Sequence, residues 1–274
     1  MTDPSKTLYY NITIQCSLDG FCFVIHHQEE NKIIDMKLYQ TSEATDESVT
    51  MEAMEKALFK KELLGKPFLS VRFIVSNRYN TIVPAELFEA SKQEAYLRFN
   101  HALPQGYKVF HEPLDILNAV NVFALPESQY EHLCNTWTGI KFTHQTTAFL
   151  NGIMREEAYE SNTNAYVNVN SRSFDLAIVK DGKLDFFNNF KFNTKEDFVY
   201  FLMLTLKQQL EGRDVPVHFS GLISNNSEII RLCERYIKRI RFVRPDGSVN
   251  VDLSLSSIPF QYYYIPYKNL SCES

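Results

Sequence analysis

The sequence predicts an α/β protein built from two similar βββαβα halves. A motif of two apolar runs around a short polar stretch occupies residues 12–25 and occurs again at residues 165–178. The two copies are separated by a constant offset of 153 residues. A further strand-like segment follows each copy, at residues 32–39 and 183–190. Each copy is therefore expected to form a three-stranded meander, within a duplicated fold that has a cleft between its halves.

The composition is typical of a folded globular chain. Hydrophobic residues make up 45% and charged residues 22% of the 274 residues, which is enough apolar area for one large core or two smaller ones. The formal net charge is −5 and no basic stripe stands out, so the charge pattern does not support nucleic-acid binding. No apolar run approaches the roughly 20 residues that cross a bilayer, so no transmembrane segment is expected.

Cysteine usage indicates a reducing compartment. The five cysteines, Cys16, Cys22, Cys134, Cys233 and Cys272, form an odd number without a C-x-x-C pair, and four of the five have apolar neighbours. This pattern favours small buried side chains over disulfides or a zinc site. The first residues are polar and lack the apolar core of a signal peptide. We therefore expect a cytoplasmic protein.

Helices and strands are expected to alternate after the first meander. Met51, Met54 and Leu58 recur at helical spacing, and Gly65 is expected to end that helix. A proline in the first turn predicts the start of another helix at residues 83–88. The remaining expected elements are strands at 69–75, 106–110, 121–125 and 140–143 and helices at 126–137 and 146–159.

The second meander is followed by a similar alternation. Thr194 and Asp197 have the spacing of a capping box, which predicts a helix that ends near Gly212. Asn225 is expected to cap a further helix. The remaining expected elements are strands at 215–219 and 240–243, a turn at 220–226, a helix up to about 238 and a strand through the tyrosines at 262–264. The polar stretch at 160–164 suggests domains at 1–160 and 161–274.

The order of elements and two short segments carry a resemblance to a known superfamily. Residues 121–150 pass through a strand, a helix, a Gly-containing turn and another helix before the second meander. Residues 179–184 are similar to a characteristic hairpin turn, and residues 217–222 are similar to an adenosine loop. This organisation resembles the actin-like ATPase superfamily, with its ribonuclease H-like fold, and is most similar to the pilus-assembly type. The whole chain resembles an uncharacterised bacterial family linked to that fold.

The residues at the phosphate-loop positions depart from the superfamily pattern. The resemblance implies an Asp at the end of the first strand, which binds Mg²⁺ or its waters, and a Gly two residues later, which lets backbone N–H groups approach phosphates. The first copy has Gln15 and Ser17 at these positions, and the second has Asn168 and Asn170. Neutral amides are weak ligands for Mg²⁺, and the side chains obstruct a backbone cradle. These loops therefore do not support ATP or Mg²⁺ as a cofactor.

Five other residues near the expected cleft have a functional and a structural interpretation. Asp19 is either a metal ligand or part of an Asp-Gly turn with Gly20, and Asp175 is either a ligand or a residue on a solvated strand face. Arg172 either meets an anion or lies on the surface. Gly221 stands where the adenosine loop of the superfamily has two adjacent glycines, but Leu222 follows it here.

The amides and one histidine have similar alternatives. Asn168 and Asn170 either hydrogen-bond each other's loop or a ligand, or form Asx turns. His144 is expected to cap a turn. The sequence contains no Walker loop, no Gly-x-Ser-x-Gly and no His-x-x-x-His.

Three functions remain open from the sequence. The first is a degenerate, non-catalytic actin-like protein that acts as a scaffold or interaction module, with another protein or a second copy as its partner. The second is an ATPase or phosphotransferase in which Asp19 or Asp175 replaces the lost aspartate. The third is a sensor that binds a small molecule without reacting it. The departures at all four loop positions favour the first.

Overall fold

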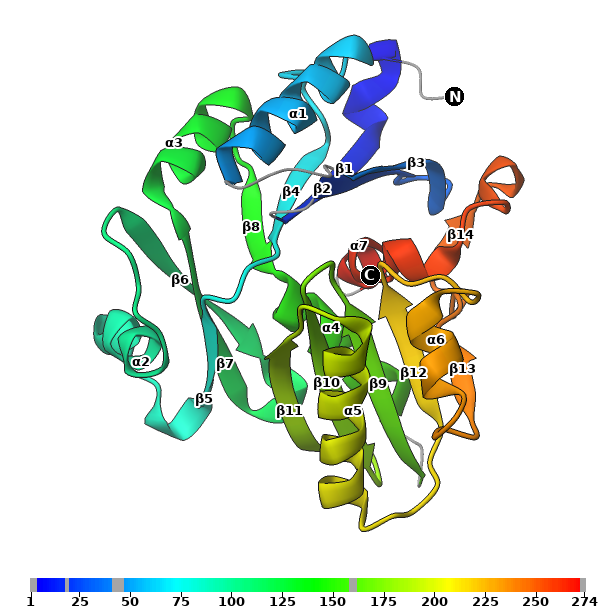
Figure 1. Cartoon of the computed structure of the whole chain (residues 1–274). Helices are drawn as coiled ribbons and strands as arrows, with labels where there is room; N and C mark the ends of the chain where they lie inside the picture. The colour runs from blue at the N-terminus through cyan, green and yellow to red at the C-terminus, as the bar shows by residue number, and fades with distance from the viewer. Residues whose placement is uncertain (1–3, 18–19, 41–46, 158–161, 272–274) are drawn as a thin grey trace. The chain divides into compact units, whose positions relative to one another are not determined.

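The computed structural model describes residues 4–17, 20–40, 47–157 and 162–271 (Figure 1). Contacts between residues divide the chain into two compact units. The first unit comprises Met1–Ala148, Gly247–Ile258 and Pro266–Ser274, and the second comprises Phe149–Asp246 and Pro259–Ile265. The expected domain division at residue 160 stays a prediction, because compactness does not show which parts fold independently.

The first unit contains a six-stranded sheet in the order β14-β3-β2-β1-β4-β8. Its strands are β1 (Tyr10–Ser17), β2 (Gly20–His27), β3 (Lys32–Gln40), β4 (Ser70–Val75), β8 (Lys141–His144) and β14 (Asn250–Val251). Strands β1, β2 and β3 pair antiparallel, whereas β4 and β8 extend the sheet in parallel from β1. The first expected meander is therefore confirmed.

One face of this sheet packs against two helices, α1 (Glu47–Lys60) and α3 (Glu127–Thr136). Ile12 and Ile14 of β1 are fully buried on this face, together with Leu58 of α1. Because side chains alternate along a strand, the residues between them face the other way. Polar residues such as Thr13 and Gln15 occupy that second face.

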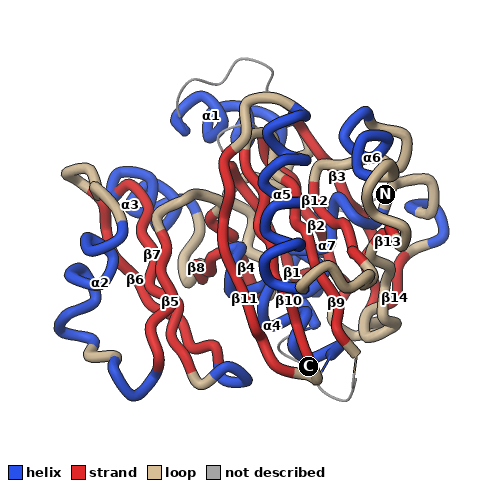
Figure 2. Tube along the Cα trace, turned by 60° about the horizontal axis from the view of Figure 1, so that its bottom comes forward, coloured by secondary structure: helices blue, strands red, loops and turns tan. Residues whose placement is uncertain are grey.

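A separate three-stranded sheet also belongs to the first unit. It has the antiparallel order β5-β7-β6, formed by β5 (Asn80–Pro84), β6 (Tyr107–Leu114) and β7 (Ala119–Pro126). Helix α2 (Gln93–Asn100) lies beside this sheet (Figure 2). Its Leu97 is buried in a small core with Val83, Val122 and Ala124.

The prediction of a helix starting at residues 83–88 is wrong. Val83 and Pro84 are the last two residues of β5, paired with Val120 and Ala119 of β7. Burial of the Val83 side chain outweighs the helix signal of the following proline, which an edge strand tolerates. A 3₁₀ turn, Ala85–Leu87, follows the strand directly.

The second unit contains a five-stranded sheet in the order β11-β10-β9-β12-β13. Its strands are β9 (Thr163–Val169), β10 (Ser173–Lys180), β11 (Lys183–Lys191), β12 (Val217–Gly221) and β13 (Ile240–Phe242). The second expected meander, β9 to β11, is confirmed as antiparallel, and β12 and β13 are parallel to β9. Helix α5 (Lys195–Leu210) lies along these strands (Figure 1) and packs its Phe198 and Leu202 into their core.

Helix caps in the second unit agree only partly with the sequence. The capping box is confirmed: Asp197 N donates to Thr194 Oγ1 at 3.0 Å, and the Asp197 carboxylate accepts from Thr194 N at 3.1 Å. The next helix, α6 (Glu228–Cys233), is shorter than expected, and its cap is Ser227 instead of Asn225. Asn225 instead accepts a hydrogen bond from Gln261 at 3.2 Å.

The prediction of a strand at residues 262–264 is also wrong. These tyrosines lie in a 3₁₀ turn, Phe260–Tyr263, and in helix α7 (Tyr264–Ser271). Tyr264 and Tyr267 are fully buried. Tertiary burial of aromatic side chains therefore decides this segment, where β propensity alone suggests a strand.

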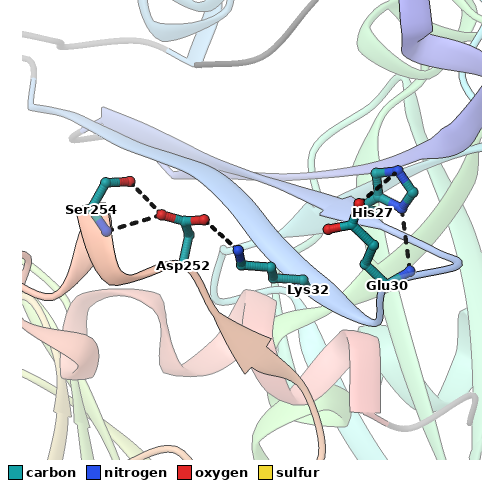
Figure 3. A network of polar contacts seen from close by, with 5 residues as sticks. All are labelled: His27, Glu30, Lys32, Asp252 and Ser254. Atoms are coloured by element: carbon teal, nitrogen blue, oxygen red, sulfur yellow. Dashed lines mark hydrogen bonds and ion pairs between the residues drawn. The ribbon is translucent and has the colours of Figure 1, made fainter.

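Residues 247–258 add the short strand β14 to the first unit. Asn250 and Val251 pair in parallel with Lys32 and Ile33 of β3. Beyond this pairing, Lys32 Nζ lies 2.6 Å from a carboxylate oxygen of Asp252. Asp252 also accepts hydrogen bonds from the backbone and hydroxyl of Ser254, while His27 and Glu30 form a neighbouring pair (Figure 3). The late segment is thus held at the edge of β3.

Two of the four boundaries between the units fall within helices α4 (Gln145–Glu157) and α7, and the other two, at 246/247 and 258/259, fall outside helices and strands. The remaining 3₁₀ segments are Pro4–Tyr9, Ala90–Lys92, Asp115–Leu117 and Leu253–Leu255. Among the described residues, no helix is both long enough and apolar enough to span a membrane.

Candidate functional site

The first meander holds Gln15 in hydrogen bonds to its own chain. Gln15 on β1 stands opposite Cys22 on β2. Its Nε2 donates to Ser76 Oγ at 2.9 Å, and the Cys22 thiol donates to its Oε1 at 3.8 Å. Burial raises the pKa of Cys22 to about 12, so this group stays a neutral thiol. Both ends of the Gln15 amide are therefore engaged.

The turn of the first meander is closed by local contacts. Ser17 Oγ donates to the carbonyl of Gly20 at 3.2 Å. Gly20 has a φ of +149°, and a Cβ there would lie 2.2 Å from the carbonyl oxygen of Tyr39. Gly20 is therefore required by the close approach of β3. Asp19 lies outside the described residues.

The second meander places a buried carboxylate in a row of polar side chains. Asp175 on β10 stands opposite Asn168 on β9 and Asn189 on β11, and Asn168 stands opposite Ser220 on β12. Asn189 Nδ2 donates to Asp175 Oδ1 at 2.8 Å, and Asn168 Nδ2 donates to Oδ2 at 3.2 Å. Ser220 Oγ in turn donates to Asn168 Oδ1 at 3.2 Å. Four neighbouring strands thus share one hydrogen-bonded chain.

The expectation that Asp175 lies on a solvated strand face is wrong. Its exposed fraction is 1%. Burial raises its pKa to about 6, and the hydrogen bonds from Asn189 and Asn168 limit this rise. A ligand approaching this carboxylate would have to displace amide donors that already occupy both oxygens.

Asn168, Asn170 and Arg172 have three different environments. Asn168 reaches across to the neighbouring strands, so the expectation of an Asx turn is wrong there. Asn170 contacts its own hairpin, with its backbone N–H donating to the Ser173 carbonyl at 2.8 Å. Arg172 is exposed at the tip, in agreement with its structural interpretation.

Gly221 is explained by close packing at the end of β12. It has a φ of +84°, and a Cβ there would lie 2.1 Å from the carbonyl oxygen of Val169. The next residue, Leu222, donates its N–H to that same carbonyl at 2.7 Å. Only glycine fits this approach to β9. The first two residues of the expected turn at 220–226 belong to β12.

Sequence reasoning missed the partners that complete these two networks. They are Cys22 and Ser76 in the first unit and Asn189 and Ser220 in the second. One signal was available, because Cys22 and Asp175 are separated by the same 153-residue offset as the two copies of the motif. Across the described residues, no group of three His, Cys, Asp or Glu side chains is placed to hold a metal ion.

Comparisons with known proteins identify a family and a fold. The sequence model of a family described as "Protein of unknown function (DUF3822)" matches residues 1–240. The curated proteins contain no match. Among solved structures, a protein of actin-like ATPase fold and unknown function from Bacteroides thetaiotaomicron is 20% identical, with a TM-score of 0.78 over 94% of this chain and 98% of that chain.

Two further solved structures are similar at lower identity. A chain of the PilM-PilN type IV pilus biogenesis complex is 11% identical, with a TM-score of 0.57 over 96% of this chain and 99% of that one. The ethanolamine utilization protein EutJ from Carboxydothermus hydrogenoformans is 10% identical, with a TM-score of 0.50 over 94% and 88%. The expected actin-like α/β fold is therefore confirmed.

Proposed function

The chain belongs to the DUF3822 family of unknown function, and we propose that it is a non-catalytic actin-like protein that acts as an interaction module. The observation that carries this proposal is the use of the phosphate-loop positions. Gln15 and Asn168 stand where the superfamily has aspartates, and both are bonded to neighbouring strands of their own sheets. Their amides stabilise the fold and are not free for a metal-bound phosphate.

A protein partner is the second part of the proposal. A chain of similar fold occurs in the PilM-PilN type IV pilus biogenesis complex, which supports this fold as a platform for other proteins. For the present chain, the partner is either another protein or a second copy. No disulfide joins the described cysteines, Cys16, Cys22, Cys134 and Cys233, which supports work in the reducing cytoplasm.

The main alternative is an ATPase or phosphotransferase with a non-standard site. Asp175 is the described carboxylate that such a site would use, and a pKa of about 6 suits a proton acceptor. Its burial and its two amide donors argue against this role. A small-molecule sensor is the other alternative, and it requires binding without turnover.

Two measurements on the full chain test the enzyme alternative and the partner. The wild-type chain should release phosphate from Mg²⁺-ATP no faster than the Asp175→Asn variant does, because the proposal gives Asp175 a structural role. Release by the wild-type chain that the variant lacks would overturn the proposal in favour of the enzyme.

Sedimentation velocity over a range of protein concentrations tests the partner. A sedimentation coefficient that rises with concentration identifies a second copy as the partner. A constant coefficient excludes self-association at those concentrations and assigns the interaction to a different protein.

A further inference from the structure

The first turn of helix α4 is held by one polar side chain from each strand of the three-stranded sheet. Asn80 comes from β5, Asn121 from β7 and Glu112 from β6. Asn80 Nδ2 donates to Thr146 Oγ1 at 3.2 Å, and Asn121 Nδ2 donates to Thr147 Oγ1 at 2.9 Å. This small sheet is therefore attached to the start of α4 through polar contacts.

Glu112 is the acceptor at the end of this network. Its Oε2 accepts a hydrogen bond from Thr143 Oγ1 at 2.5 Å, and its Oε1 accepts from the backbone N–H of His144 at 2.8 Å. The hydroxyl of Thr147 is a further partner. These donors surround the N-terminus of α4, where backbone N–H groups have no partner within the helix. No acidic residue of α4 itself occupies this first turn.

The hydrogen bonds form a directed chain that ends on the carboxylate. Asn80 Nδ2 donates to Asn121 Oδ1 at 3.2 Å, and Asn121 donates to Thr147. Thr147 is then oriented to donate to Glu112. Asn121 and Thr147 are buried, whereas Asn80 and Glu112 at the two ends of the chain are half-buried. Solvent therefore does not replace a partner lost at Asn121. The protonation state of Glu112 therefore affects every member of the chain.

We propose that Glu112 and the first turn of α4 form a proton-controlled latch. Proton uptake by the Glu112 carboxylate strengthens the attachment of the three-stranded sheet to this turn, and proton loss weakens it. The proposal concerns the first unit alone and does not depend on the proposed function.

The sign of the effect follows from burial without a counter-charge. Burial raises the pKa of Glu112 from 4.5 to about 7, and the hydrogen bonds from Thr143, His144 and Thr147 limit the rise. When the sheet separates from the turn, the carboxyl becomes hydrated and returns to its ordinary value. The latched state therefore binds the proton more tightly, and its stability decreases as the pH rises through about 7.

The other groups around Glu112 do not change charge in this range. The ring of His144 contacts the Asn77 carbonyl through Nε2 at 3.1 Å, and its Nδ1 accepts from Thr146 N at 3.2 Å. This second bond confirms the expectation that His144 caps a turn. Burial lowers the pKa of His144 to about 3, so it stays neutral. Strands β5 and β7 contribute the neutral Asn80 and Asn121.

The lysines of β6 and β8 have other surroundings. Lys108, on the same face of β6, lies over the ring of Tyr130 at 3.8 Å. Lys141 of β8 is exposed. Burial and hydrogen bonds alone account for the shift of Glu112, with no charged neighbour among its causes. The carboxyl is therefore the group that titrates at this position.

Hydrogen exchange of the full-length protein, measured by mass spectrometry at about pH 6 and about pH 8, tests the latch. After correction for intrinsic exchange rates, protection of peptides covering residues 107–114 and 141–148 should fall about ten-fold between these pH values. In Glu112→Gln the same peptides should show no such fall. Constant protection in the wild type, or an equal fall in Glu112→Gln, would overturn the proposal.

Two further variants separate the latch from a purely structural role. Thr147→Val removes a hydrogen-bond donor that lowers the pKa of Glu112. The pH at which half of the protection against hydrogen exchange is lost should therefore move upward. Asp175→Asn removes another buried carboxylate, in the second unit, and should leave the fall in peptides 107–114 and 141–148 unchanged. A midpoint unmoved by Thr147→Val, or a fall abolished by Asp175→Asn, would contradict the assignment to Glu112.

Discussion

The two meanders place different chemistry at equivalent positions. In the first, Gln15 stands opposite Cys22, so an amide meets a thiol. In the second, Asn168 stands opposite Asp175, so an amide meets a carboxylate. The register is the same in both pairs, and Asn168 is buried whereas the equivalent Gln15 is half-buried. The duplicated backbone therefore fixes where polar groups meet, while the residue types decide how costly each contact is to lose.

The two networks show how polar residues at these positions are used within the sheets themselves. In each unit, the amide at the aspartate position serves a neighbouring strand: β2 in the first unit, and β10 and β12 in the second. Buried polar groups must be hydrogen-bonded, and these networks supply the partners. The second network contains more members and should be the more sensitive to substitution.

Exchanging the residues that follow the two turns should have the largest effect on the stability of the protein. Gly20 and Ser173 are equivalent, but only Gly20 is pressed against the neighbouring strand. We expect Gly20→Ser to destabilise the protein by about 3 kcal/mol or more, since its Cβ meets a backbone oxygen, and Ser173→Gly by about 1 kcal/mol. Urea unfolding followed by circular dichroism measures both. Equal effects would show that the two turns are alike.

Truncating the two equivalent polar pairs should give the next largest effect. Asp175→Ala leaves the buried amide of Asn168 and the half-buried amide of Asn189 without their acceptor, at a cost of about 3 kcal/mol. Gln15→Ala, at a half-buried position, should cost about 1 kcal/mol. The same unfolding measurement applies. A larger loss of stability for Gln15→Ala than for Asp175→Ala would contradict the order that burial predicts.

The carboxylate should also make stability depend on pH in a way that the amide variant does not. The native pKa of Asp175 is raised to about 6, so the folded state binds a proton that the unfolded state has released. The stability of wild type relative to Asp175→Asn should therefore fall by about 1.4 kcal/mol from about pH 5 to about pH 8. Urea unfolding at both pH values tests this. A difference that stays constant would mean that Asp175 titrates normally.

Substitutions at the ends of the helices that follow the two meanders should have the smallest effect on stability. Glu62 follows α1 with a φ of +56°, and Glu211 follows α5 with a φ of +51°. Left-handed backbone is strained for glutamate and suits glycine. Glu62→Gly and Glu211→Gly should each raise stability by about 0.5 kcal/mol in thermal unfolding. Destabilisation by either would show that its side chain makes a contact that outweighs the strain.

Much of the fold could be predicted because the sequence repeats its patterns locally. The apolar runs predict both meanders, and Thr194 with Asp197 predicts a helix start, since these signals lie within a few residues. Tertiary contacts decide the misassigned segments. Val83 belongs to a strand because β7 pairs with it, and Tyr264 is helical because it is buried.

The candidate site could be predicted only in part. The positions of Gln15 and Asn168 follow from the repeat, but their partners come from strands far away in the chain, such as Ser76 and Ser220. A single sequence does not show that Asp175 is buried, because Asp on a strand is usually solvated.

The most direct test of the central claim is isothermal titration of the full chain with ATP, with and without Mg²⁺, up to millimolar nucleotide. Because the amides at the aspartate positions are bonded within their own sheets, the account predicts no saturable heat under either condition. Saturable binding that requires Mg²⁺ would contradict it and would show that these polar groups serve a nucleotide.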